Sequence, residues 1–118
     1  MLHADCPVNE WSRLEDTLNT HYKRSRAIAK WSRARLEREN CEGVSGVRAV
    51  VAGHTPVAVP QALGNFIHID TAGWESSGYF TLLNLDLATT HRAALRPDEE
   101  RKRKGSSRAR RELIPILP

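Results

Sequence analysis

The segment from Val50 to Trp74 reads VVAGHTPVAVPQALGNFIHIDTAGW, and it decides most of the predicted fold. The apolar run GVRAVVAG predicts a strand over Val47–Ala52, with His54 just beyond its C-terminal end. The turn signal Gly64-Asn65 separates a brief extended PVAVP piece from another strand over Phe66–Ile69. The pattern predicts a small sheet that holds a histidine at the end of one strand.

Helices precede this segment, and one more strand follows it. From Glu10 to Asn40, apolar and aromatic residues recur at intervals of three and four, which predicts one or two amphipathic helices, the second within Ala27–Glu39. The run YFTLLNL predicts a last strand over Tyr79–Leu85. The predicted fold class is therefore α/β, with helices followed by a small mixed or antiparallel sheet. Candidates for the inner sheet face are Val50, Ile67, Ile69 and Leu82.

Length and composition predict one domain in a cytoplasmic protein. A chain of 118 residues is long enough for one core. The sequence contains no run of about 18 apolar residues, so no membrane-spanning helix is predicted. The opening MLHADCPVNEW lacks the apolar core of a secretory signal. Two cysteines are too few for a disulfide scaffold, so reduced thiols are expected.

The positive charge is concentrated at the C-terminal end. Residues 1–90 hold nine Lys/Arg and ten Asp/Glu, whereas residues 91–112 hold nine Lys/Arg and four Asp/Glu. We therefore expect a folded part over 1–90 and a basic, disordered tail over 91–118. The run RKRKGSSRARR supports an alternative function, in which a non-catalytic protein binds nucleic acid or an acidic partner weakly through this tail.

His54 is the first candidate for chemistry. A strand followed by Gly-His-Thr-Pro fixes an imidazole at the edge of a sheet, which suits a metal ligand, although a single histidine there is also an ordinary surface residue. Taken with LHADCPVNEW, KWSRARLERE, GNFIHIDTAGW and SGYFTLLNLDL, the segment resembles the C-terminal half of the calcineurin-like metallophosphoesterases. The likeness is to their serine/threonine protein phosphatase branch, typified by bacteriophage lambda phosphatase.

The resemblance implies half of a four-layer αββα sandwich and a centre of two divalent metals, manganese or iron and zinc. His3 and His54 would be ligands of the second metal. Asp5 and Asp70 are candidates to hydrogen-bond these imidazoles, and an ordinary turn carboxylate is at least as good an interpretation of Asp70. An arginine of the KWSRARLERE helix would grip the substrate phosphate, Arg35 being the better match and Arg33 the fallback. The implied substrate is a phosphoprotein or a small phosphomonoester.

Three motifs of that family are missing. Gly-Asp-x-His, Gly-Asp-x-x-Asp-Arg-Gly and Gly-Asn-His-Glu, which supply the first metal's ligands, the bridging Asp, an Asn ligand and a histidine acid, do not occur in the sequence. Two histidines cannot build a two-metal centre, so the chain alone is expected to be inactive. A truncated product, a decayed gene and one half of a two-chain enzyme all stay open, and the sequence leaves open whether this chain is an enzyme.

Other residues have weaker claims. His68 alternates with two isoleucines, which predicts an exposed position on the opposite strand face, and His21 matches no motif. Trp74 is expected either beside the substrate cleft or in the core. Cys6 and Cys41 with the two candidate histidines would give a zinc site of unusual spacing.

Overall fold

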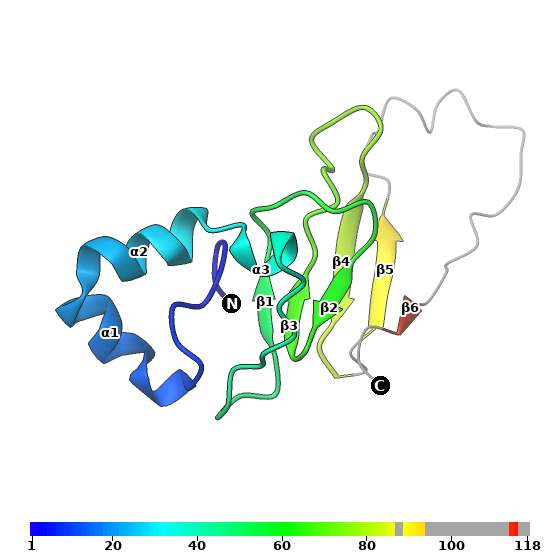
Figure 1. The fold of residues 1–118 in the computed structure, drawn as a ribbon. Coiled ribbons are helices and arrows are strands. Elements are labelled where there is room, and N and C mark those ends of the chain that lie inside the picture. The colour runs from blue at the N-terminus through cyan, green and yellow to red at the C-terminus, as the bar shows by residue number, and fades with distance from the viewer. Residues whose placement is uncertain (87–88, 94–113, 116–118) are drawn as a thin grey trace, which may run out of the picture.

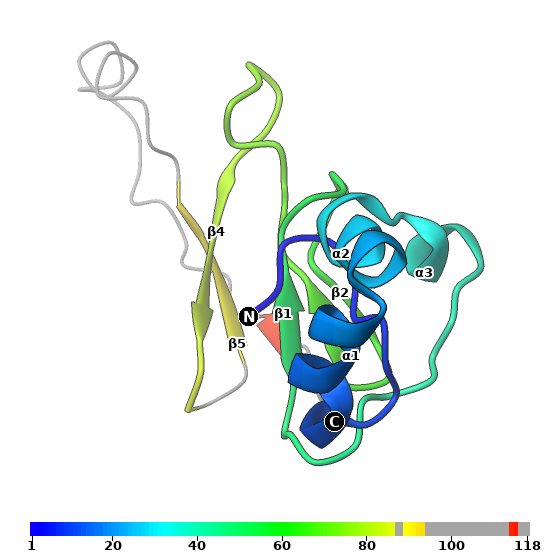
Figure 2. The same cartoon turned by 90° about the vertical axis from the view of Figure 1, so that its left-hand side faces the viewer.

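The computed structural model describes residues 1–86, 89–93 and 114–115. Helices lie on one side of a three-stranded sheet, and a second group of strands lies on its other side (Figure 1). Turned by 90°, the view from the helix side shows the helices overlapping part of the central sheet, with the second group of strands standing apart on the left (Figure 2). The predicted mixture of helices and a small sheet is confirmed. In the part of the chain described, no helix is long and apolar enough to cross a membrane.

The helical region is a chain of short elements. A 3₁₀ turn, η1 (Trp11–Arg13), leads into α1 (Leu14–Thr20), and α2 (Tyr22–Trp31) and α3 (Ala34–Glu37) follow. Ser25 forms the joint between α1 and α2, because its buried hydroxyl lies 3.0 Å from the Thr17 carbonyl oxygen and 2.7 Å from that of His21. This joint stabilises the end of α1, whose last carbonyls have no partner within the helix.

The predicted second helix over Ala27–Glu39 is wrong as one element. The helix ends at Trp31, and Ser32 adopts an extended conformation with φ −66° and ψ 134°. The Ser32 hydroxyl then accepts a hydrogen bond from the Ala34 N–H at 3.3 Å, at the start of α3. Serine competes with helix geometry in this way because its side chain bonds nearby backbone groups.

The central sheet has the strand order β1-β3-β2. β1 (Val50–Ala52) pairs in parallel with β3 (Phe66–His68), which pairs antiparallel with β2 (Gln61–Leu63). The strands predicted over Val47–Ala52 and Phe66–Ile69 are confirmed in place but are shorter, and β2 was missed because PVAVP ends just before it. Gly64 makes the turn between β2 and β3 with a φ of +61°, a conformation that favours glycine.

β1 and β3 are buried on both faces of the sheet, whereas β2 is partly exposed. One face joins β1 and β3 to the N-terminal segment and α1, in a cluster of Cys6, Leu14, Val44, Val50, Ala52 and Phe66. The other face presents Val51 and Ile67, which are paired across the sheet, to a cavity of about 350 Å³ that Leu83 also lines. Val50 and Ile67 are both buried as predicted, but they lie on opposite faces, and Ile69 is only half-buried.

The prediction that His68 is exposed is wrong. Its side chain is only 3% exposed, and its ring centre lies 5.1 Å from that of Phe66. The alternation along β3 holds, but this face is covered by the N-terminal segment and the helical region and does not meet solvent. Alternation therefore gave the correct face for His68 and the wrong surroundings.

The second group of strands is antiparallel. β4 (Phe80–Asn84) pairs with β5 (Thr89–Ala93), which pairs with β6 (Ile114–Pro115). β4 confirms the core of the strand predicted over Tyr79–Leu85, but Leu82 is 57% exposed and is not an inner-face residue. The predicted boundary after residue 90 falls inside β5, and most of the predicted tail, including RKRKGSSRARR, lies outside the described residues.

Candidate metal-binding histidine pair

The N-terminal segment carries His3 to the end of β1. The Leu2 N–H donates to the Val51 carbonyl at 2.9 Å, and the Gly53 N–H donates to the His3 carbonyl at 3.2 Å. On its other side, the Ala4 N–H donates to the Ala29 carbonyl of α2 at 2.8 Å. Three backbone hydrogen bonds therefore hold residues 2–4 between the central sheet and α2.

This arrangement brings the two predicted metal ligands together. The ring centres of His3 and His54 are 4.7 Å apart, with the ring planes inclined by 47°. Two imidazoles on one metal ion, each with a metal–nitrogen bond of about 2.1 Å, have ring centres no more than roughly 6 Å apart. The spacing therefore fits a shared ion, although the ligand role itself stays a prediction.

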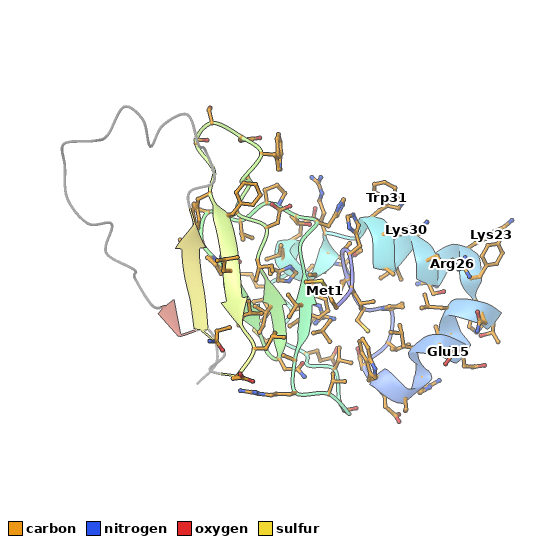
Figure 3. All side chains as sticks on the ribbon, turned by 180° about the vertical axis from the view of Figure 1, so that it is seen from behind. Met1, Glu15, Lys23, Arg26, Lys30 and Trp31 are labelled. Atoms are coloured by element: carbon orange, nitrogen blue, oxygen red, sulfur yellow. The ribbon has the colours of Figure 1, made fainter. Side chains whose placement is uncertain are left out.

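Trp31 forms one wall of the pair. Its ring meets His54 edge-on at 5.7 Å and His3 at 6.4 Å between ring centres. The side chain stands at the end of α2 (Figure 3) and is 66% exposed. His3 is exposed and His54 is half-buried, and neither imidazole hydrogen bonds to a described residue, so their ring nitrogens are available to an incoming ligand.

Two histidines are all that the described part of the chain offers here. Within residues 1–86, 89–93 and 114–115, no three His, Cys, Asp or Glu side chains gather in a way that would hold a metal. The zinc site imagined from Cys6, Cys41 and the two histidines is therefore not formed, with Cys6 buried and Cys41 exposed. Any ion at the pair would need further ligands from elsewhere.

Arg35 is held inside the core and does not face a substrate. Its side chain is 5% exposed; Nε donates to Asp5 Oδ1 at 2.8 Å, and Nη1 donates to the Glu42 carbonyl at 2.6 Å. The guanidinium also lies 4.5 Å from the centre of the Phe66 ring. The predicted phosphate-binding role of Arg35 would break these contacts, whereas Arg33, the fallback, is exposed.

The two predicted carboxylate partners of the imidazoles have other contacts. Asp5 accepts both from Arg35 and, at 2.7 Å, from the Cys6 N–H. Asp70 Oδ1 accepts from the Ala72 N–H at 3.0 Å, which is the turn role that the sequence also allowed. Among the described residues, neither carboxylate hydrogen bonds to His3 or His54. Of the two predicted positions for Trp74, the core is excluded, because the Trp74 side chain is 70% exposed.

Nothing in the sequence indicated that His68 is buried beside charged residues. Burial lowers its pKa from the ordinary value, nearby Asp5 opposes that shift, and Arg35 adds to it. Its Nε2 atom has no hydrogen-bond partner among the described residues. Burial also raises the pKa of the Cys6 thiol, which the Val8 backbone partly offsets. These shifts favour the neutral forms, and they mark a buried polar layer that also contains Asp5 and Arg35.

Comparisons with protein-family models, with curated proteins and with solved structures find no match to this chain. The assignment of a function therefore depends on the histidine pair and on the motifs that carry the resemblance.

Proposed function

We propose that residues 1–90 are the C-terminal half of a metallophosphoesterase of the serine/threonine phosphatase branch. The observation that carries the proposal is the meeting of His3 and His54. The motifs HAD and GHTP are far apart in the sequence, yet the ring centres of their histidines lie 4.7 Å apart at the end of one strand. The finer fold expected, half of a four-layer sandwich, is part of this proposal.

In this proposal the two imidazoles supply two ligands of one divalent metal, and manganese, iron or zinc would suit them. A divalent ion held in such a centre lowers the pKa of bound water and stabilises charge on a phosphoryl group. The chain's own contribution is positional: backbone hydrogen bonds hold the N-terminal segment beside the end of β1, and the Trp31 ring lies against both imidazoles. Exposed Arg33 is available to hold a phosphate of a phosphoprotein or small phosphomonoester.

The remaining ligands must come from a second polypeptide segment that carries the three missing motifs. The described residues provide no third ligand. Turnover by this chain alone with manganese and p-nitrophenyl phosphate should therefore be negligible. Mixing it with an N-terminal half that carries the three motifs should restore hydrolysis, and His54→Ala should abolish it. Robust turnover by the chain alone would contradict the proposal.

Metal binding by the pair tests the proposal directly. Calorimetric titration with zinc should show one weak site that His3→Ala and His54→Ala each remove. The matched control is His21→Ala, because His21 is exposed at the joint of α1 and α2 and belongs to no pair. Equal zinc binding by His54→Ala and the control would rule out the pair as a metal site.

A further inference from the structure

The helical region carries an unusual density of exposed positive charge. From Tyr22 to Arg38 the only acidic residue is Glu37, and one of the basic residues, Arg35, is buried. In the part of the chain described, the only ion pair is that of Arg35 with Asp5, so the exposed cations have no carboxylate within 4.0 Å. The exposed cations are Lys23, Arg24, Arg26, Lys30, Arg33 and Arg38.

Three of these cations form a stripe along α2. Lys23, Arg26 and Lys30 are spaced by three and four residues, which places them on one face of the helix. Their side chains follow the helix toward Trp31 at its end (Figure 3). The stripe is about 10 Å long at 1.5 Å per residue, enough to face roughly three phosphates of one strand. An acidic residue of α1, Glu15, lines the same hollow as Arg26 and Lys30 without pairing to either.

Aromatic rings flank the stripe. Tyr22 is 52% exposed and Trp31 is 66% exposed, and the Arg26 guanidinium lies 5.5 Å from the centre of the Tyr22 ring. A large exposed indole is costly to leave in water and offers a flat face on which a base can stack. Cations that track a backbone, beside aromatic rings that stack on bases, are the features that bind single-stranded nucleic acid without sequence preference.

A membrane surface fits these residues less well. An interfacial helix inserts an apolar face into the lipid boundary. Apart from its two rings and the small side chain of Ala27, the exposed part of α2 is cationic, and its one large aliphatic residue, Ile28, is half-buried. An acidic protein would satisfy the charges but gives no role to the exposed rings.

We infer that α2 and Trp31 form a docking surface for single-stranded nucleic acid. The Lys23, Arg26 and Lys30 side chains contact successive phosphates, and the Trp31 indole stacks on a base. This surface is distinct from the basic tail, and it does not depend on the proposed function, because it needs no metal at the histidine pair.

The test uses the full chain and a fluorescein-labelled oligothymidylate of about 12 nucleotides. Anisotropy titrations between about 50 and 200 mM NaCl give the affinity and its salt dependence. The triple variant Lys23→Gln/Arg26→Gln/Lys30→Gln should bind the oligonucleotide at least tenfold more weakly at about 0.1 M salt. The slope of log K against log salt should fall in magnitude by about 2, because each of the three lost phosphate contacts contributes about 0.7. Glutamine keeps helix propensity, and circular dichroism checks the fold.

Matched controls separate this surface from general charge. The tail variant Lys102→Gln/Arg103→Gln/Lys104→Gln removes the same charge and should weaken binding less. Trp31→Ala should weaken binding about fivefold or more while Trp31→Phe largely retains it, and Trp74→Ala, at another exposed tryptophan, should have no effect. Added EDTA, which would remove any metal from the histidine pair, should leave binding unchanged, and this keeps the result separate from the metal proposal.

Three outcomes would overturn the inference. The first is an unchanged salt slope in the α2 triple variant, and the second is equal weakening by the two triple variants. The third is that phosphatidylserine vesicles or poly-glutamate displace the oligonucleotide at matched charge, which would indicate a membrane or an acidic protein as the partner of α2.

Discussion

Removing the Arg35 side chain should destabilise the whole fold. Arg35→Met would leave the Asp5 carboxylate buried, with a side chain 10% exposed, without its guanidinium partner. Breaking a buried ion pair from one side costs about 3–5 kcal/mol, because an uncompensated charge is left inside. The variant would also lose the hydrogen bond to the Glu42 carbonyl and the contact with Phe66. We therefore expect a loss of about 4 kcal/mol in the free energy of unfolding, within that range.

The double variant Asp5→Asn/Arg35→Met should recover part of this loss, because it removes both charges together. Coupling between contacting residues of this kind amounts to about 0.5–3 kcal/mol in a double-mutant cycle.

Urea unfolding followed by tryptophan fluorescence measures these differences. Arg35→Lys keeps the charge and should be intermediate, and it provides a folded variant if Arg35→Met does not fold. Arg33→Met is the matched control at an exposed position, where a change within about 0.5 kcal/mol is expected. A loss below about 1 kcal/mol in Arg35→Met would refute the structural role and would return Arg35 to phosphate binding.

Three further predictions concern the buried polar layer and the turn between β2 and β3. Burial lowers the pKa of His68 in the folded state, so the unfolded chain binds a proton at His68 more readily. The free energy of unfolding should therefore fall as the pH drops below about 6.5. Urea titrations at about pH 7 and about pH 5 should show a smaller fall for His68→Met. Asn65→Ala should cost about 2–4 kcal/mol, since its amide makes three hydrogen bonds to the backbone of residues 44–47; wild-type stability would contradict this. Gly64→Ala should lower the free energy of unfolding by at least about 1 kcal/mol, because φ is positive there and a Cβ would meet a neighbouring carbonyl. Gly53→Ala is the control: a Cβ at Gly53 would meet open space, so the stability of this variant should be nearly unchanged in the same assay.

The sequence predicted the local elements better than their surroundings. The apolar run before Gly53 located β1, and the Gly64-Asn65 signal located the turn, because both are written in adjacent residues. The interruption at Ser32 was not predicted, since helix formers surround it and the break places Arg35 against Asp5, a contact between residues distant in sequence.

The candidate site was predictable only through the order of its motifs. The number of residues between His3 and His54 does not by itself predict that the two side chains lie close together. Their proximity depends on backbone hydrogen bonds that the N-terminal segment makes to β1. The burial of His68 was not predictable for the same reason, because a strand pattern reveals which face a side chain shares and not what covers that face.

The position of the first four residues affects how the protein should be produced. Residues 2–4 are fixed between β1 and α2, and Met1 is 84% exposed beside them, close in sequence to His3. A polyhistidine tag fused ahead of Met1 would therefore place many competing imidazoles next to the pair, and it could imitate a metal site in any titration. Purification tags belong at the C-terminal end, or they should be removed before metal is added.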